Sequence, residues 1–136
     1  MEMNQNQKNE QKKSGSVFAK GAMLNNKSSM QECIDKCMEC STTCLELIPY
    51  CLNKGAEHAE AQHIMLLQNC AEICRTSATL MISNSQFSAD LCNVCASVCN
   101  QCADSCKEFG DDQMMNQCAT VCRECADSCK QTTKMA

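Results

Sequence analysis

The sequence predicts an all-α protein, an antiparallel up-down-up-down four-helix bundle with a cysteine-lined core. Cysteines recur at steps of three and four residues in four stretches of the chain, which is the spacing of one face of a helix. Short breaks that contain glycine, serine or aspartate separate these stretches. The chain has 16 cysteines but 3 phenylalanines, 1 tyrosine and no tryptophan, so thiols must take core positions that larger apolar side chains normally fill.

The chain divides into a polar tail and one compact domain. Residues 1–28 are rich in Asn, Gln, Lys and Ser and show little periodicity, which predicts a flexible tail. Residues 29–133 form the predicted four-helix domain, and this length fits a single core. The segment from Ser29 to Glu32 has the spacing of a capping box, in which the serine hydroxyl and the glutamate each satisfy a free amide at a helix start.

The first predicted helix begins at Ser29 and is stopped by Gly55, with Pro49 close to its end. Its core-facing stripe consists of Cys33, Cys37, Cys40, Cys44, Leu47 and Cys51. The second helix is predicted from about Glu57 to Ile82. Its core-facing stripe consists of Glu60, His63, Leu67, Cys70, Cys74, Ser77 and Met81.

The third predicted helix runs from Ser85 or Ser88 to Phe109 and is followed by a glycine. Its stripe consists of Cys92, Cys95, Cys99, Cys102 and Cys106. The fourth helix is predicted to be capped by Asp111 or Asp112. Its stripe consists of Met115, Cys118, Cys122, Cys125, Cys129 and Thr132.

Helices of this length joined by links of a few residues must run antiparallel to their neighbours. The topology therefore predicts which helix ends meet. One end of the bundle is expected to gather Cys51, His63, Met115 and either Cys106 or Phe109. The other end is expected to gather Met30, Met81, Ser88 and Thr132.

The charge pattern excludes several classes of partner. The net charge is -4, with +3 on residues 1–28 and -7 on the remainder, and no basic stripe with interleaved aromatics is present, so nucleic acid is not an expected partner. No apolar run is long enough to span a bilayer, and the first residues lack the apolar segment of a secretory signal. A cytoplasmic location is therefore expected, where cysteines remain reduced.

Dense cysteines admit several kinds of chemistry. Disulfide frameworks usually staple loops, whereas these cysteines repeat within helices. Four Zn(II) ions bound by 16 thiolates would leave a charge of -8 in the core, whereas one Cu(I) per thiolate leaves it neutral. An alternative interpretation is that the cysteines are simple small core residues, but stripes of them on four helices disfavour it. On each helix, cysteines four residues apart lie on one face and are candidate pairs for holding one Cu(I).

The cysteine ladders on all four predicted helices, with the segments 70–76 and 122–129, resemble the bacterial copper storage proteins over about residues 29–132. The resemblance implies a four-helix bundle, often in a homotetramer, that holds many Cu(I) ions along its core. Its cytosolic members lack an export signal. The second helix departs from a full ladder, because Leu67 and Ser77 stand at positions where thiols would continue it.

The sequence thus predicts that the protein binds and stores multiple Cu(I) ions and is not an enzyme, since no catalytic triad, paired-carboxylate site or phosphate loop is visible. A thiol-disulfide redox protein and a zinc or heavy-metal buffer remain the alternatives. Two further ligands, His63 and Met115, are predicted at the mouth of the core. The predicted cysteine ligands are Cys33, Cys37, Cys40, Cys44, Cys51, Cys70, Cys74, Cys92, Cys95, Cys99, Cys102, Cys106, Cys118, Cys122, Cys125 and Cys129.

Overall fold

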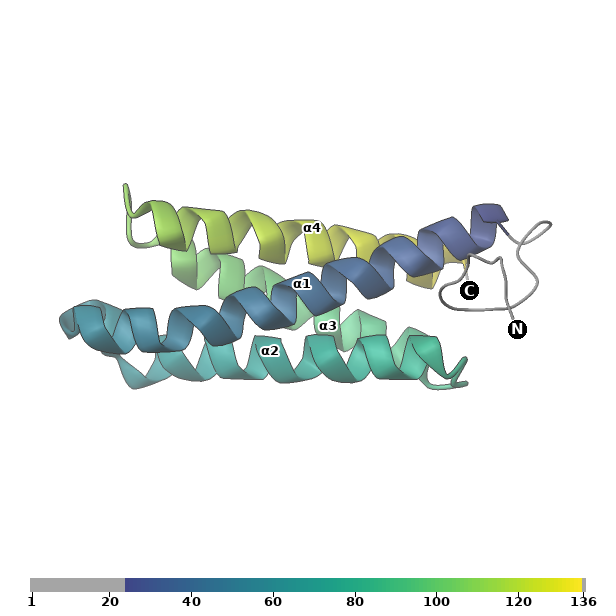
Figure 1. The fold of residues 1–136 in the computed structure, drawn as a ribbon, viewed down its shortest axis with the longest axis horizontal. Helices are drawn as coiled ribbons and strands as arrows, with labels where there is room; N and C mark the ends of the chain where they lie inside the picture. The colour runs from purple at the N-terminus through teal and green to yellow at the C-terminus, as the bar shows by residue number, and fades with distance from the viewer. Residues whose placement is uncertain (1–23, 136) are drawn as a thin grey trace, which may run out of the picture.

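The computed structural model describes the backbone of residues 24–135 and the side chains of residues 29–134, and it confirms the predicted all-α bundle. Four helices run up and down along one long axis (Figure 1). Their bounds are α1 Leu24–Lys54, α2 Ala61–Ile82, α3 Ser88–Lys107 and α4 Gln113–Met135, with a short 3-10 turn, η1, at Ala56–Ala59. Within the described residues, no helix combines the length and apolar character needed to cross a membrane.

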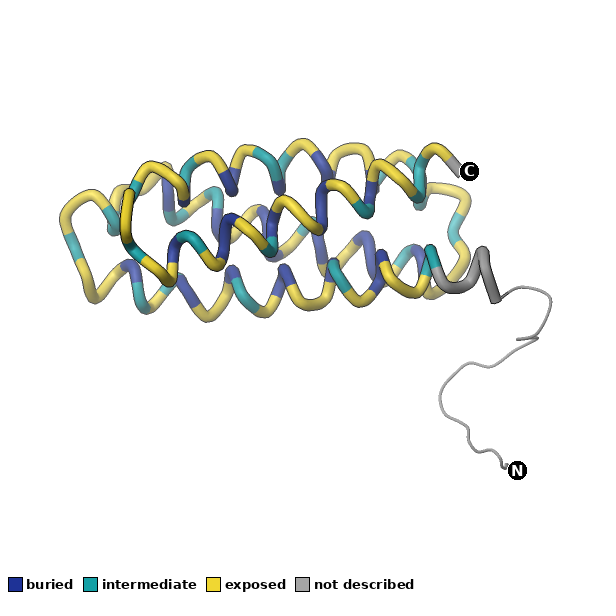
Figure 2. The backbone as a smooth tube through the Cα atoms, turned by 90° about the horizontal axis from the view of Figure 1, so that it is seen from above, coloured by how far each residue is buried: buried dark blue, intermediate teal, exposed yellow. Residues whose placement is uncertain are grey.

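The four helices form a closed square. Helix α1 packs against α2 and α4, and α3 packs against the same two helices. Within residues 24–135, α1 has no close backbone contact with α3, and α2 has none with α4, so the members of these two pairs face each other across the core. The cysteine stripes on all four helices therefore point at one shared axis, whereas Glu60, predicted on the α2 stripe, is exposed just before that helix begins. Buried residues line the inside of the tube along its whole length (Figure 2).

The core consists mostly of small side chains. Alanines buried beside the cysteines are Ala71, Ala78, Ala96, Ala103, Ala119 and Ala126. The hydroxyl of Ser41 in α1 donates to the carbonyl oxygen of Ala71 in α2 at 2.9 Å, which places two helix backbones close together. Small residues at helix contacts bring the axes together, and this close approach allows side chains as short as cysteine to meet in the middle.

Helix α1 begins at Leu24, so the start predicted at Ser29 is wrong. The segment before Ser29 contains no proline or glycine after Gly21, so it lacks the residues that most strongly oppose an earlier helix start. The capping-box spacing at Ser29 therefore does not mark the start of the helix. Residues 1–23 of the predicted tail lie outside the part of the chain that the structure describes.

The second helix begins at Ala61, and the start predicted near Glu57 is also wrong. Gly55 and Ala56 have positive φ angles of 73° and 49°, which turn the chain out of α1. The 3-10 turn follows, and Glu60 then adopts an extended backbone with ψ of 142° as the residue preceding α2. The link between α1 and α2 is therefore six residues long, whereas the predicted helix bounds left a link of only two or three residues.

The remaining boundaries lie close to the predictions. Helix α3 begins at Ser88, the later of the two predicted starts, and ends at Lys107, two residues before Phe109. Gly110 has a φ of 63° and reverses the chain. Asp112 caps α4, because its Oδ1 accepts a hydrogen bond from the backbone amide of Met115 at 3.0 Å.

Candidate metal centre

All sixteen cysteines are free thiols inside the bundle, and none is more than 1% exposed. Each comes from the core-facing stripe of its helix, where steps of three and four residues keep the side chains on one face. The sequence prediction that every one of them faces the core is therefore confirmed. Sulfur is the dominant polar or polarisable atom along the axis.

The thiols form a continuous chain of contacts, here called the sulfur network. Neighbouring Sγ atoms lie 3.5 to 4.0 Å apart, well beyond a disulfide bond length. The members joined by these contacts are Cys33, Cys37, Cys40, Cys44, Cys70, Cys74, Cys95, Cys99, Cys118, Cys122, Cys125 and Cys129. The network runs along most of the bundle without a break.

Most short contacts join different helices. Cys70 of α2 lies 3.7 Å from Cys40 of α1 and 3.7 Å from Cys99 of α3. Of the candidate pairs within one helix, Cys95/Cys99 and Cys118/Cys122 are in contact, at 3.8 and 3.9 Å. The structure therefore brings together thiols from different helices, whereas the sequence could pair them only along each helix.

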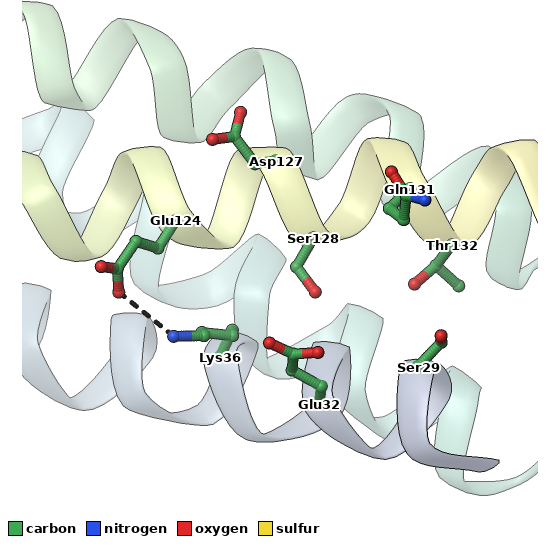
Figure 3. Close-up of a pocket in the computed structure, with 8 residues that line it drawn as sticks. All are labelled: Ser29, Glu32, Lys36, Glu124, Asp127, Ser128, Gln131 and Thr132. Carbon is green, nitrogen blue, oxygen red and sulfur yellow. Dashed lines mark hydrogen bonds and ion pairs between the residues drawn. The ribbon is translucent and has the colours of Figure 1, made fainter. Parts of the chain in front are cut away.

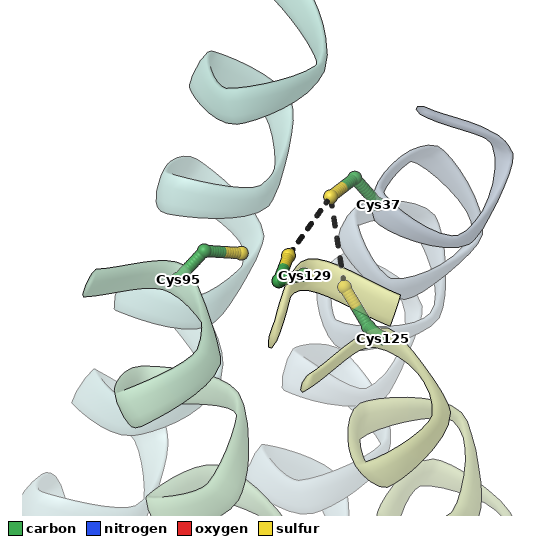
Figure 4. A group of neighbouring side chains, drawn as sticks. All are labelled: Cys37, Cys95, Cys125 and Cys129. Carbon is green, nitrogen blue, oxygen red and sulfur yellow. Dashed lines mark hydrogen bonds between the residues drawn. The ribbon is translucent and has the colours of Figure 1, made fainter. Parts of the chain in front are cut away.

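Groups of four thiols recur along the network. In Figure 4, Cys37 of α1, Cys95 of α3, and Cys125 and Cys129 of α4 point toward one another. The Sγ atoms of this group all lie within 4.8 Å of one another. Similar groups are Cys40/Cys70/Cys74/Cys99, Cys40/Cys44/Cys70/Cys122, Cys44/Cys102/Cys118/Cys122 and Cys74/Cys95/Cys99/Cys125. Successive groups share members, so one thiolate can bridge two metal ions.

The sulfur spacing suits metal ions bound by three or four sulfurs. With a metal–sulfur bond of about 2.3 Å, as in zinc thiolates, two sulfurs are separated by about 4.0 Å in a trigonal site and about 3.8 Å in a tetrahedral site. A linear two-sulfur site needs about 4.6 Å, which small rotations of the side chains would supply. The network is thus spaced for metal ions before any arrives.

Burial favours the protonated form of the thiols when no metal is bound. Burial, with a smaller contribution from Asp112, raises the pKa of Cys51 to about 11. Inside the network, hydrogen bonds from neighbouring thiols make the larger contribution to raising the pKa of thiols such as Cys122 and Cys129, and burial also raises it. A proton must therefore leave for each thiolate–metal bond that forms, and an ion with a single positive charge replaces that proton without changing the charge of the core.

One end of the bundle, here called the His63 end, carries a different set of ligand atoms. His63 is 5% exposed, and its Nε2 lies 3.5 Å from the Sγ of Cys51. The thiol of Cys51 donates to the Sδ of Met115 at 3.8 Å. The three predicted residues at this end are therefore brought together, with an imidazole, a thiol and a thioether around one point.

The imidazole of His63 is held in an orientation suited to ligation. Its Nδ1 lies 2.7 Å from the hydroxyl oxygen of Ser105, and a proton on Nδ1 leaves the Nε2 lone pair facing Cys51. Burial lowers the pKa of His63, which favours the neutral ring that can bind a metal. The ring of Phe109 packs against His63 at 4.8 Å between centroids. Ser105 is a supporting residue that sequence reasoning did not single out.

A groove leads from solvent to His63 between α2 and α3. It has a volume of about 650 Å³, and His63 and Phe109 form part of its lining. The carboxylates that line it are Glu57, Glu60, Asp104 and Glu108. Asp104 is paired with Arg123, and the other three carboxylates give the approach to His63 a negative potential that favours cations.

His58 takes no part in the cysteine core. Its Nε2 lies 2.9 Å from Oδ2 of Asp112, and the same oxygen accepts a hydrogen bond from the Tyr50 hydroxyl at 2.9 Å. Although burial opposes the shift, hydrogen bonds from the Met115 amide, His58 and Tyr50 lower the pKa of Asp112 to about 2. This charged group fastens η1 and α1 to the start of α4 and so fixes the position of Met115.

The chain is similar to several known proteins. The family model described as copper storage protein matches residues 26–134. A Nitrosospira multiformis protein of known structure is 42% identical, covers 80% of this chain and 98% of its own, and superposes with a TM-score of 0.75. The Cu(I)-bound copper storage protein BsCsp3 is 28% identical, with 77% and 98% of the two chains covered and a TM-score of 0.71.

A curated relative from Bacillus subtilis, the uncharacterized cysteine-rich protein YhjQ, is 30% identical over 66 residues. That match covers 48% of this chain and 61% of the relative's length.

Proposed function

The chain belongs to the copper storage protein family, and from that premise we propose that its sixteen cysteines, with His63 and Met115, are the ligands with which it binds and stores Cu(I). Members of this family are copper storage proteins. Storage of multiple Cu(I) ions inside a four-helix bundle follows from the family and from the clustered thiols. The proposal concerns which residues bind the copper ions.

The continuous network of buried thiols is the observation that carries the proposal. Soft thiolates favour Cu(I), and one Cu(I) for each thiolate gives a neutral core that can stay dry. Zinc at four thiolates per ion would leave two negative charges per site in a medium of low dielectric constant, which carries a heavy desolvation penalty. The sulfur network therefore matches a singly charged soft ion better than a divalent one.

The His63 end is proposed as the entrance for copper. Support comes from the acidic groove that reaches His63 and from the contact between His63 and Cys51. An ion would pass from the carboxylates to the imidazole and then to Cys51, with Met115 as a neutral soft ligand at the same point. From Cys51 the ion reaches the cysteines of α3 and α4.

The proposed location is the cytoplasm, and its support is the set of free thiols. Twelve of the sixteen cysteines lie in contact at 3.5 to 4.0 Å, and thiols this close remain reduced only where the surroundings are reducing. A homotetramer is proposed from the family resemblance alone. Exposed apolar side chains such as Leu45 and Leu52 on α1 offer surface that subunits could share.

An anaerobic titration of the reduced protein with Cu(I), against a chromophoric chelator, tests the function. Uptake close to one copper per thiol is expected, or about 16 ions per chain, because each thiolate neutralises one charge. Parallel titration with Zn(II) is expected to saturate near one ion per four thiols and to bind far less metal. Saturation with Cu(I) after one or two ions would rule out storage and favour a redox or sensor role.

A further inference from the structure

The end of the bundle opposite His63, here called the Met81 end, carries a second contact between a thiol and a thioether. The thiol of Cys92, in the first turns of α3, donates to the Sδ of Met81, in the last turn of α2, at 3.8 Å. The contact between Cys51 and Met115 at the His63 end has the same length. Each end of the core is therefore closed by one cysteine and one methionine, although only one end has an imidazole.

Met81 differs from the methionines that serve as surface or filling residues. Met38, Met65 and Met114 are 46%, 58% and 43% exposed. Met81 and Met115 are 3% and 0% exposed, and among the residues with described side chains these two methionines accept a hydrogen bond from a thiol. A gap-filling methionine needs no such contact, because its flexible chain packs equally well against any apolar neighbour.

The pair is continuous with the sulfur network. Cys33 lies 3.8 Å from Cys129, and the Cys33 and Cys92 thiols are close enough for each to shift the pKa of the other. Met81 continues the core-facing stripe of α2 beyond Cys74, at the spacing that a further cysteine would have. The last sulfur of the α2 ladder at this end is therefore a thioether.

We propose that Met81 is a Cu(I) ligand, and that with Cys92 and Cys33 it forms a histidine-free terminal copper site at the end of the core opposite His63. The inference rests on the proposed storage of Cu(I). Binding replaces the proton of the Cys92 thiol, which leaves to solvent, while Met81 contributes a sulfur lone pair and no charge. A thioether lets the last copper gain another soft ligand without adding a negative charge to the core.

A groove lies on the surface between α1 and α4, near this end of the bundle. It has a volume of about 330 Å³, and Figure 3 shows its lining, with Lys36 on α1 pointing toward Glu124 on α4. Thr132, whose hydroxyl helps to lower the pKa of the Cys33 thiol, forms part of the same lining. The terminal site is thus close to a polar, mainly acidic surface.

Methyl NMR of the full chain, labelled with 13C at the methionine methyl groups, tests the proposal. Cu(I) is added anaerobically up to one ion per thiol, and M81L and M115L variants identify the two resonances. The Met81 and Met115 methyl signals are expected to shift on loading, whereas those of Met38 and Met65 stay in place. A Met81 signal that does not move when the core is full overturns the proposal.

Copper uptake gives a second readout. Met81→Leu conserves side-chain volume and is expected to preserve the fold, which circular dichroism checks. Against a competing chelator, this variant is expected to give up one copper more readily than the unchanged chain, whereas the matched control Met38→Leu retains it. Equal retention by the two variants overturns the terminal site while leaving storage intact. Saturation of the unchanged chain after one or two ions overturns the proposed function, and with it this site.

Discussion

Replacing Leu67 with cysteine is expected to add one copper to the capacity of the protein. Leu67 is fully buried on the core-facing stripe of α2, one turn from Cys70 toward His63. The group formed by Cys44, Cys102, Cys118 and Cys122 contains no member from α2, whereas the neighbouring group with Cys40 includes Cys70. A thiol at position 67 would supply the missing helix and extend the network toward His63.

The change removes two buried methyl groups and places a thiol where the leucine side chain branched. The loss of apolar burial lowers the free energy of unfolding of the metal-free protein by roughly 2 kcal/mol. The control variant Leu67→Ala creates a larger cavity and is expected to lose about 2–5 kcal/mol without providing a ligand. Denaturant unfolding measures both losses.

Anaerobic competition with a chromophoric chelator measures the copper content of the two variants. L67C is expected to take up one ion more than the unchanged chain, and L67A is expected to take up the same number as the unchanged chain. Copper should also restore more stability to L67C than to L67A, because metal that binds only the folded state stabilises it. If L67C holds no more copper than L67A, the reasoning that core-facing thiols set the capacity is refuted.

Three further predictions concern pH and the His63 end. The affinity for Cu(I) should fall about tenfold for each copper when the pH is lowered by one unit, because thiols such as Cys51, with a pKa of about 11, must release a proton. Chelator competition across pH 6–8 measures this slope. An affinity that does not change with pH contradicts the prediction. His63→Gln should slow anaerobic Cu(I) loading in stopped-flow experiments, whereas His58→Gln should not, and equal rates in the two variants would remove His63 from the entrance. Asp112→Ala should lower the free energy of unfolding by about 1–2 kcal/mol through loss of the α4 cap. The pKa of Asp112 in the folded protein, about 2, lies below its ordinary value of 3.8. Its contribution to the free energy of unfolding is therefore present above pH 4 and lost toward pH 2. Acid titration of D112A should lack this loss of stability between pH 4 and pH 2.

The contents of the core could be predicted from the sequence because helical periodicity is local. A step of three or four residues returns to the same face of any α-helix. The cysteines from Cys33 to Cys51 must therefore share one face of their helix, and those from Cys118 to Cys129 must share one face of theirs. Short links then required antiparallel neighbours, which placed Cys51, His63 and Met115 at one end. None of these inferences depends on how far one helix slides past another.

Helix starts were less predictable, since they depend on a few backbone angles. The reversal after α1 uses a positive φ at Ala56 as well as at Gly55, and alanine carries no signal for that conformation. The capping-box spacing at Ser29 likewise describes a local hydrogen-bond option that the longer α1 does not use as its start.

The amino-acid sequence by itself determined that sixteen thiols would share one core and that a neutral copper–thiolate interior was chemically favoured. The tertiary structure alone decided which thiols meet. Contacts such as Cys40 with Cys70, and Cys92 with Met81, depend on the axial offset and rotation of neighbouring helices. Those offsets arise from packing of residues such as Ser41 against Ala71. Such packing depends on two helix surfaces in contact, so the residue spacing within either helix alone cannot predict it.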